Sequence, residues 1–193
     1  MRRAPRPDRT ICMELGETLD VADRGKWRHW LARNHDKKTE IWLVFHRKAS
    51  GRPRISYDES VEEALCYGWI DSQVKNIDKE SYAQRFTPRR PRRPVSEMNK
   101  ERIRRLLAEG KMTPAGTGVA GDIGSKLEIA LDILAELRRD DQAWANFAAF
   151  PESYRIIRIA FIEGARKRPN EFKRRLNHFL EMTAKGKMFG MVR

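Results

Sequence analysis

The sequence has little that would tie it to a membrane, to export or to a structural metal. No apolar run in its 193 residues approaches the ~20 residues that a membrane-spanning helix needs. The basic start, MRRAPRPDRTICMELG, is not followed by an apolar stretch of signal-peptide length. The two cysteines, Cys12 and Cys66, have no CxxC or Cys/His spacing, which indicates a reducing compartment and argues against structural zinc. We therefore expect a cytoplasmic protein without a membrane span.

Histidine is also sparse, and its four copies are irregularly placed, at His29, His35, His46 and His178. This spacing suggests neither a metal site nor a base that would activate Cys66 as a nucleophile. We expect no metal and no cofactor, and we interpret Cys66 as a packing residue beside the apolar face of its helix. An enzyme that uses Cys66, or the carboxylates of Glu63 and Asp71, is the alternative.

Positive charge, by contrast, is abundant and unevenly distributed. Of the net charge of +13, residues 1–9 contribute +3, residues 85–106 contribute +7 and residues 165–193 contribute +7, which leaves −4 for all other residues. Basic segments on a mildly acidic body attract polyanions such as nucleic acid or phosphorylated small molecules, although they also serve as solvated faces. Nucleic-acid binding through residues 85–106 and 165–193 is a further alternative, but no RNP-like or helix-turn-helix pattern supports it.

The apolar pattern predicts a folded N-terminal part with both helices and strands. Hydrophobic residues make up 40% of the chain and include five tryptophans, which is enough for a core. Trp27, Trp30 and Leu31 recur at helical spacing and predict a helix over residues 23–34. The apolar run over residues 41–45 predicts a central strand that is covered on both faces.

A second helix and a hairpin follow. The segment SYDESVEEALCYG predicts the helix, with Ser60 and Glu63 at capping-box spacing and Gly68 as its left-handed stop. Trp69 then starts a strand, and the next residues predict a hairpin that turns around residues 78–81. A further helix is expected in SEMNKERIRRLLAEG, with Leu107 among its inward residues.

The rest of the chain is organised by glycine and by helical patterns. Residues 110–124 hold five glycines and a proline, which predicts a linker. The letters GxGxxG occur at residues 116–121, but no strand precedes them, as a dinucleotide site requires. Only helical patterns follow, the first with Ser125 and Glu128 at capping spacing and with Leu131 on its apolar side.

We therefore predict an α+β fold, in which a small mixed or antiparallel sheet is flanked by helices and is followed by an all-helical C-terminal module. The expected parts are a basic N-terminal arm (1–22), the α+β domain (23–115), a glycine-rich linker (116–124) and the helical module (125–193).

The predicted hairpin carries the candidate site. Asp71 follows the apolar pair Trp69 and Ile70 near a strand end, where a charge needs a partner or water. If the hairpin folds back, basic side chains approach Asp71: Lys75, Arg85, Arg89 and Arg90. Arginines bind phosphate or carboxylate oxygens, and Asp71 and Glu63 would orient them. Tyr67, Trp69 and Phe86 would supply a stacking wall. The same residues also suit a plain structural salt bridge.

Several of these residues also carry a family resemblance. The segments EEALCYGWIDS and YAQRFTPRRP, then Ser96 and Asn99, then LLAEGKMTPAG, together with FPESYRIIRIAFIEGARKRP and FKRRLNHFL, resemble the YdeI/OmpD-associated family, also described as bacteriocin-protection proteins. The likeness spans roughly residues 25 to 190. Arg93 and Val95 stand where the family commonly has serine and tryptophan, so the resemblance implies a more basic pocket here.

The resemblance implies a role in tolerance of bacteriocins and cationic antimicrobial peptides, with no reaction tied to it. Ser96 and Asn99, which keep the family pattern, join the candidate ligand-binding residues on this ground. We expect a non-enzymatic, stress- or resistance-associated protein that binds an anionic small molecule or polyanion. The porin partner that the family name suggests is not carried over, because no export signal is present.

Overall fold

The structure is a computed structural model that describes residues 15–90, 94–121, 123–124 and 128–190. The chain forms two compact units. The N-terminal unit consists of the described residues up to Arg90 together with Thr113–Val119. The C-terminal unit consists of the described residues of Pro91–Met112 and of Ala120–Arg193. The chain therefore leaves the first unit after Arg90 and returns to it for seven residues.

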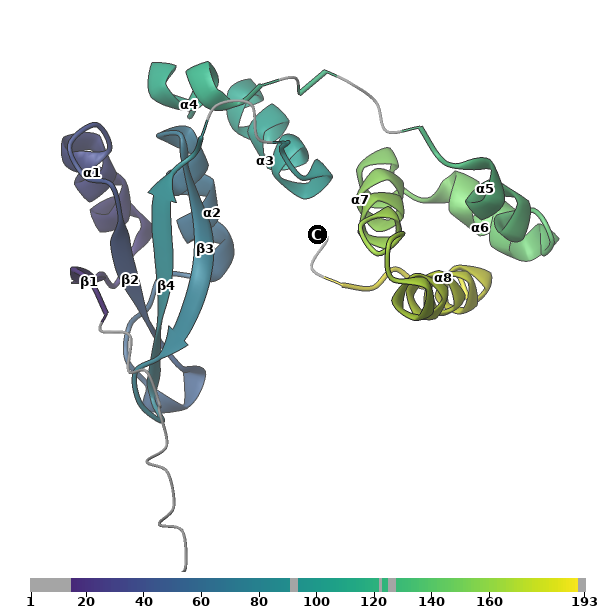
Figure 1. The fold of residues 1–193 in the computed structure, drawn as a ribbon, viewed down its shortest axis with the longest axis horizontal. Coiled ribbons are helices and arrows are strands. Elements are labelled where there is room, and N and C mark those ends of the chain that lie inside the picture. The colour runs from purple at the N-terminus through teal and green to yellow at the C-terminus, as the bar shows by residue number, and fades with distance from the viewer. Residues whose placement is uncertain (1–14, 91–93, 122, 125–127, 191–193) are drawn as a thin grey trace, which may run out of the picture. The chain divides into compact units, whose positions relative to one another are not determined.

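A four-stranded mixed sheet is the centre of the N-terminal unit, in the order β1-β2-β4-β3 (Figure 1). Its strands are β1 (Thr18–Asp20), β2 (Ile41–His46), β3 (Trp69–Asn76) and β4 (Ser81–Pro88). β1 pairs with β2 in parallel, and the other two pairings are antiparallel. The predicted α+β fold with a small mixed sheet is confirmed. Residues 18–20, expected within the N-terminal arm, are instead an edge strand.

Two helices, α1 (Arg24–Asn34) and α2 (Tyr57–Cys66), pack together and contribute to the core of this unit. Trp27 of α1 is fully buried, and its ring contacts Phe86 of β4 with centroids 5.4 Å apart. Tyr57 at the start of α2 bonds to Asp71 of β3. Both contacts lie on one side of the sheet, because Phe86 and Asp71 are directly paired across neighbouring strands.

The predicted start of α2 is wrong by one turn. The helix is capped by Ser56, whose Oγ accepts a hydrogen bond from the Glu59 N–H, while the Glu59 side chain accepts one from the Ser56 N–H. Ser60 lies inside the helix, where its hydroxyl donates to the carbonyl oxygen of Tyr57 at 2.7 Å. The predicted stop is confirmed, because Gly68 has a φ of 73°, in the region that glycine occupies without steric cost.

Helix α4 (Pro114–Val119) occupies part of the segment that the glycine content had marked as a linker. Thr113, just before it, is tied to the end of α2, because its backbone N–H and its hydroxyl both donate to the carbonyl oxygen of Cys66, at 3.1 and 2.6 Å. Gly116 packs against that same backbone. Residues 116–119 are therefore helical, and the glycine at position 116 provides for close approach rather than for flexibility.

The C-terminal unit is built of helices: α3 (Glu97–Ala108), α5 (Leu131–Leu137), α6 (Asp141–Ala149), α7 (Glu152–Glu163) and α8 (Pro169–Ala184). A buried cluster that includes Leu137, Phe147, Ile159 and Phe179 forms its core. The all-helical C-terminal part is confirmed.

The predicted inner faces of two of these helices need correction. α5 begins after Ala130, so Glu128 does not cap it, and Leu131 is 83% exposed while Ile133 and Leu137 are buried. Ser125, the other residue of the expected cap, lies outside the described residues. In α3, Ile103 and Leu106 are buried as expected, but Leu107 is exposed.

Candidate functional site

Asp71 does not meet the arginines that the sequence suggested. Its carboxylate accepts hydrogen bonds from the Tyr57 hydroxyl at 2.8 Å and from the Gln84 amide at 3.1 Å. All three side chains lie on the side of the sheet where Phe86 also points, because Gln84 and Phe86 are two residues apart on β4. Asp71 is thus satisfied by neutral donors, and the expectation that guanidinium groups close over it is wrong.

The basic residues of the hairpin lie on the opposite face of the sheet. Arg85 is adjacent to Phe86 on β4 and so points the other way, where its guanidinium forms an ion pair with Glu40. The ammonium group of Lys75 lies 4.7 Å from the centre of the Trp42 ring, and Trp42 is the direct strand partner of Arg85. The strand pleat therefore separates Arg85 and Lys75 from Asp71.

Arg89 and Arg90 follow β4 and have different surroundings. The Arg89 side chain is buried and donates to the carbonyl oxygen of Val119, the last residue of α4, at 2.6 Å. Burial lowers the pKa of this guanidinium, because the charged form loses water. A cation at the carbonyl end of a helix stabilises that end, so this contact gives Arg89 a structural role. Arg90 is exposed.

The three aromatic residues proposed as a stacking wall have packing roles. Phe86 and Trp69 are buried in the core, and the Trp69 indole N–H donates to the carbonyl oxygen of His35 at 3.0 Å. Tyr67 is half-buried, between the His35 ring at 5.2 Å and the Arg28 guanidinium at 5.4 Å. These rings hold α1 against the sheet end.

Ser96 and Asn99 belong to the C-terminal unit and shape the start of α3. The Ser96 hydroxyl accepts the Asn99 N–H at 3.3 Å as the helix cap. The Asn99 side-chain oxygen accepts from Arg102 at 3.0 Å. Both residues thus have roles in local helix structure, and they belong to a different unit from Asp71.

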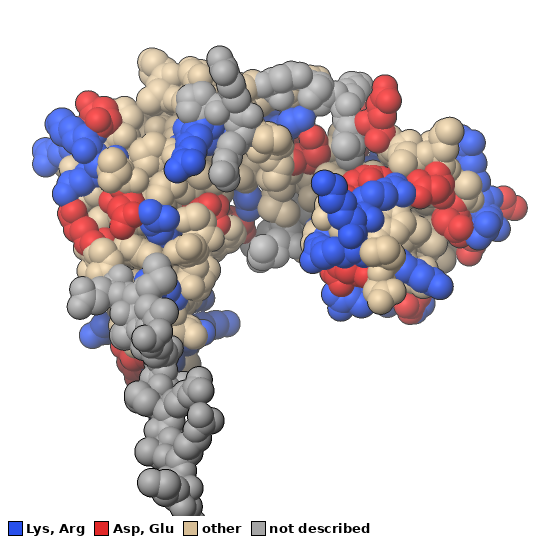
Figure 2. All heavy atoms as spheres, viewed as in Figure 1, with Lys and Arg blue, Asp and Glu red and all other residues tan. Residues whose placement is uncertain are grey.

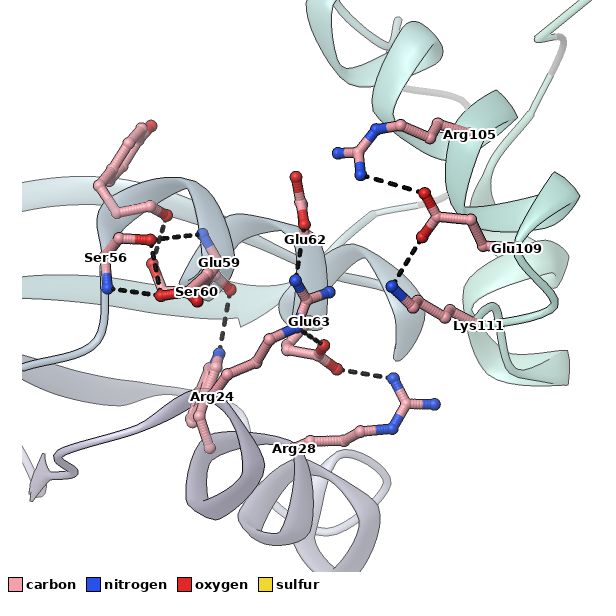
Figure 3. A network of polar contacts seen from close by, with 12 residues as sticks. Arg24, Arg28, Ser56, Glu59, Ser60, Glu62, Glu63, Arg105, Glu109 and Lys111 are labelled. Atoms are coloured by element: carbon pink, nitrogen blue, oxygen red, sulfur yellow. Dashed lines mark hydrogen bonds and ion pairs between the residues drawn. The ribbon is translucent and has the colours of Figure 1, made fainter. Parts of the chain in front are cut away.

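Glu63 does bind arginines, but these come from α1 (Figure 3). Its carboxylate is 2% exposed and forms ion pairs with Arg24 and, at 2.6 Å, with Arg28. Arg24 also reaches Glu62 at 3.0 Å. Two guanidinium groups therefore meet two carboxylates between α1 and α2, and the charges balance. Such a network fixes the two helices relative to each other.

Cys66 lies beside this network and is fully buried. Burial is the main reason that the pKa of its thiol is raised, and the Glu63 carboxylate raises it further, while Arg28 acts in the opposite direction. A nucleophilic cysteine needs the reverse, a lowered pKa and access for a substrate. These properties fit a packing role for Cys66.

The described ranges contain no cluster of three or more His, Cys, Asp or Glu side chains that could hold a metal ion. No helix in them is long and apolar enough to span a bilayer.

A cleft of about 490 Å³ lies in the C-terminal unit, between α7, α8 and the segment after α8. Its apolar walls are formed by Phe161, Ile162, Phe179 and Phe189. The volume is within the range of about 300–1,000 Å³ that small-molecule sites occupy. Aromatic walls with a few polar groups are the usual composition of such sites.

Arg158 of α7 is the unusual polar group in this cleft. It is 7% exposed, and its guanidinium lies over three rings, those of Tyr154, Phe161 and Phe189, at 5.9, 5.4 and 5.1 Å. Within the described residues it forms no ion pair or hydrogen bond, and its Nε is buried without a hydrogen-bond partner. Burial lowers the pKa of Arg158, because no carboxylate offsets the lost hydration.

The segment after α8 completes the wall around Arg158. The backbone N–H of Phe189 donates to the Tyr154 hydroxyl at 3.3 Å, and the Phe189 ring contacts His178 of α8 at 4.6 Å. Gly190 has a φ of 84°, and a Cβ atom there would lie 2.8 Å from Nη2 of Arg158. Glycine thus lets the backbone lie directly on the guanidinium.

The other charged residues of the cleft form one ion-pair network, in which a single carboxylate faces two arginines. Glu171 accepts hydrogen bonds from Arg174 at 2.7 Å and from Arg175 at 2.7 Å. The hydrogen bond from Arg175 is the largest cause of the lowered pKa of Glu171, and the bond from Arg174 is the next. Arg175 also donates to the carbonyl oxygen of Phe161 and stacks on its ring at 3.8 Å. Arg158 is therefore the cleft arginine without an acidic partner.

Two family models match the chain. Residues 19–119 match a domain of unknown function, DUF8412, which covers half of the chain. The chain belongs to this family. A later part of the DUF8412 protein, residues 126–186, matches the family described as bacteriocin-protection, YdeI or OmpD-associated. No curated protein and no solved structure matches the chain.

The second match confirms the resemblance seen in the sequence and limits its extent. The motifs around Asp71 and Arg85 fall in the DUF8412 part, whereas α5, α6, α7 and nearly all of the cleft fall in the bacteriocin-protection part. Arg158 was missed by sequence reasoning. The sequence feature that could have pointed to Arg158 is its place in the buried stripe of α7, four residues after Tyr154 and three before Phe161.

Proposed function

We propose that this DUF8412 protein binds a small anionic ligand in the cleft between α7 and α8, with Arg158 as the group that receives the anion. The observation that carries the proposal is the state of Arg158, which is buried, charged, unpaired within the described residues and part of the cleft wall. A buried charge without an ionic partner costs stability, and such a cost is common where a ligand completes the site.

The comparison with known families supports a role for this ligand in bacteriocin protection. The α7 and α8 cleft lies almost wholly within residues 126–186, the part that matches the bacteriocin-protection family. In this proposal the protein acts by binding and not by catalysis, because the alternative nucleophile Cys66 is buried with a raised pKa. The proposal keeps the anionic ligand expected from the sequence and moves it from Asp71 to Arg158.

Nucleic-acid binding has less support from the same arginines. Figure 2 shows basic and acidic side chains interleaved over the C-terminal helices on the face in view, without a continuous basic surface. Arg166 is paired with Asp132 and Glu163, and Arg174 with Glu171. A phosphate backbone would have to displace these partners. This alternative stays a prediction.

The binding test uses anilinonaphthalenesulfonate, a fluorescent monoanion with apolar rings, and the full-length protein. The change is Arg158→Met, which keeps the length of the side chain and removes its charge. We expect the dissociation constant to rise by about tenfold or more, as for loss of a charge-assisted hydrogen bond.

The matched control is Arg155→Met. Arg155 is on the same helix, also stacks on an aromatic ring at 5.5 Å and also has a buried Nε without a partner, but it does not line the cleft. Its change should leave the dissociation constant unaltered. Equal affinities of the wild type and Arg158→Met, with circular dichroism showing both folded, would overturn the proposal.

A further inference from the structure

The chain after α8 lies on the charged end of Arg158. We infer that Phe189 and Gly190 form a strap that occupies the anion-binding edge of this guanidinium, so that a ligand must displace the strap in order to bind. This inference rests on the proposed function for the identity of the site, and it adds how access to the site is controlled. It follows from the position of Gly190, from the cover over the rest of the guanidinium and from the few contacts that hold the strap.

Gly190 lies off the outer edge of the guanidinium and not over its flat face. A Cβ atom built on Gly190 would lie 2.5 Å from Nη1, 2.8 Å from Nη2 and 2.9 Å from Cζ of Arg158. An atom stacked over the middle of the flat face would be closest to Cζ, whereas here both terminal nitrogens are closer. Two N–H groups along one edge are what allow arginine to bind two oxygens of one anion. Gly190 therefore takes up space that such an anion needs.

The rest of the guanidinium is covered as well. Its Nε is buried without a hydrogen-bond partner, and its Cζ lies 5.9 Å from the centre of the Tyr154 ring and 5.4 Å from that of Phe161. The Phe189 ring lies at 5.1 Å, and Arg158 as a whole is 7% exposed. With the strap in this position, little of the charged end is open to an anion in the cleft. Removal of the strap would uncover the edge between Nη1 and Nη2.

Few contacts hold the strap in place. Within the described residues it makes one hydrogen bond, from the Phe189 N–H to the Tyr154 hydroxyl. This bond is 3.3 Å long, which is longer than the usual length of about 2.9 Å. The Phe189 ring also contacts the His178 ring, at 4.6 Å, and Met188, just before the strap, is 54% exposed. Segments with few buried contacts open at a low cost in free energy.

Such a strap links binding to opening. An anion that bonds to both terminal nitrogens of Arg158 binds only the open state, so the apparent affinity is the intrinsic affinity reduced by the open fraction. By the same linkage, a change that favours the open state strengthens binding. The protein's own chain thus acts as an autoinhibitory contact at the site.

The variant that opens the strap is Gly190→Ala. The φ of 84° at this position is unfavourable for any residue with a side chain, and the new Cβ atom would collide with Nη1 and Nη2 of Arg158. The matched control is Met188→Ala, because Met188 is exposed and does not line the cleft. Circular dichroism establishes that both variants keep the helix content of the wild type.

Access to Arg158 is measured on the full-length protein with phenylglyoxal, which condenses with the terminal nitrogens of arginine. Peptide mass spectrometry gives the rate at Arg158 and, in the same sample, at Arg174, whose side chain is 77% exposed. In the wild type we expect Arg158 to react about tenfold or more slower than Arg174. Gly190→Ala should speed the reaction at Arg158 by about fivefold or more, and Met188→Ala should leave it unchanged. Equal rates at the two arginines of the wild type, or no effect of Gly190→Ala, would overturn the strap.

Binding of anilinonaphthalenesulfonate separates this inference from the proposed function. Gly190→Ala should lower the dissociation constant by about fivefold or more, and the added change Arg158→Met should abolish this gain. Faster labelling without tighter binding would show that the strap and the anion do not compete, which overturns the autoinhibitory contact. If Arg158→Met alone binds the probe as the wild type does, the proposed function fails, while the labelling rates still decide whether the strap covers Arg158.

Discussion

Gly116 of α4 lies directly against the backbone carbonyl group of Cys66, the last residue of α2. A Cβ atom on residue 116 would lie 2.7 Å from that carbonyl carbon and 2.7 Å from the carbonyl oxygen of Leu65. Both obstacles are backbone atoms, which cannot rotate away as a side chain can. This contact, with the hydrogen bonds of Thr113, joins α4 to the end of α2.

The first prediction follows from this contact. Gly116→Ala should lower the free energy of unfolding by about 1–3 kcal/mol, as overpacking does. Gly118→Ala is the matched control, because a Cβ atom at residue 118 meets nothing within 4 Å. We expect that change to be neutral or to stabilise by up to about 1 kcal/mol, through the better helix propensity of alanine. Urea denaturation measures both, and equal effects would contradict the close contact.

The second prediction concerns the buried carboxylate between α1 and α2. Glu63→Gln leaves Arg24 and Arg28 without the charge that both contact, so we expect a loss of about 3 kcal/mol in the free energy of unfolding. Glu62→Gln should cost less, because the Glu62 side chain is more exposed, at 10% against 2% for Glu63. Denaturant titration gives the two values, and a larger loss for Glu62→Gln would refute this account.

The third prediction tests whether Cys66 is reactive. In a Cys12→Ser variant, alkylation of Cys66 by iodoacetamide at neutral pH should be slower by about 100-fold or more than in the same protein unfolded in urea, because the thiol is buried and its pKa is raised. Mass spectrometry follows the label. Labelling of the native protein at the rate of a free thiol would revive the enzyme alternative.

The fourth prediction concerns acid. Hydrogen bonds from Arg166 are the first cause of a lowered pKa for Asp132. A carboxylate whose pKa is lower in the folded state adds stability at neutral pH and loses this contribution as the pH falls below about 4. Asp132→Asn should therefore melt at a lower temperature than the wild type at pH 7, and the difference should shrink towards pH 2. A constant difference across a series of pH values would show that charge is not the cause.

Local signals explain why much of the fold was predictable. The apolar spacing around Trp27 predicts a helix and the continuous apolar run of β2 predicts a strand, and both elements are present. The helix stop at Gly68 was predictable because few residues other than glycine adopt the positive φ that such a stop needs. The start of α2 was missed because the sequence offers two Ser-x-x-Glu matches. Ser60 and Glu63 are buried inside the unit. The more exposed pair, Ser56 and Glu59, forms the cap instead.

The candidate site depended on information that the sequence does not contain. Whether Asp71 and Arg85 share a face is set by the register of the hairpin, and the irregularity between Asp71 and Val74 changes that register within β3. The position of Arg158 was accessible in principle, since an arginine in the apolar stripe of a helix needs an explanation. That it has no acidic partner could be learned only from the packing of α7, α8 and Phe189.

The return of the chain to its first unit has a consequence for how this protein can be divided. A gene fragment that stops at residue 112 encodes the sheet without α4, which covers Cys66 and receives Arg89 at its carboxyl end. A fragment that continues through Val119 includes α4, and with it α3. Recombination between relatives would therefore preserve the sheet only at breakpoints beyond residue 119, which is also where the DUF8412 match ends.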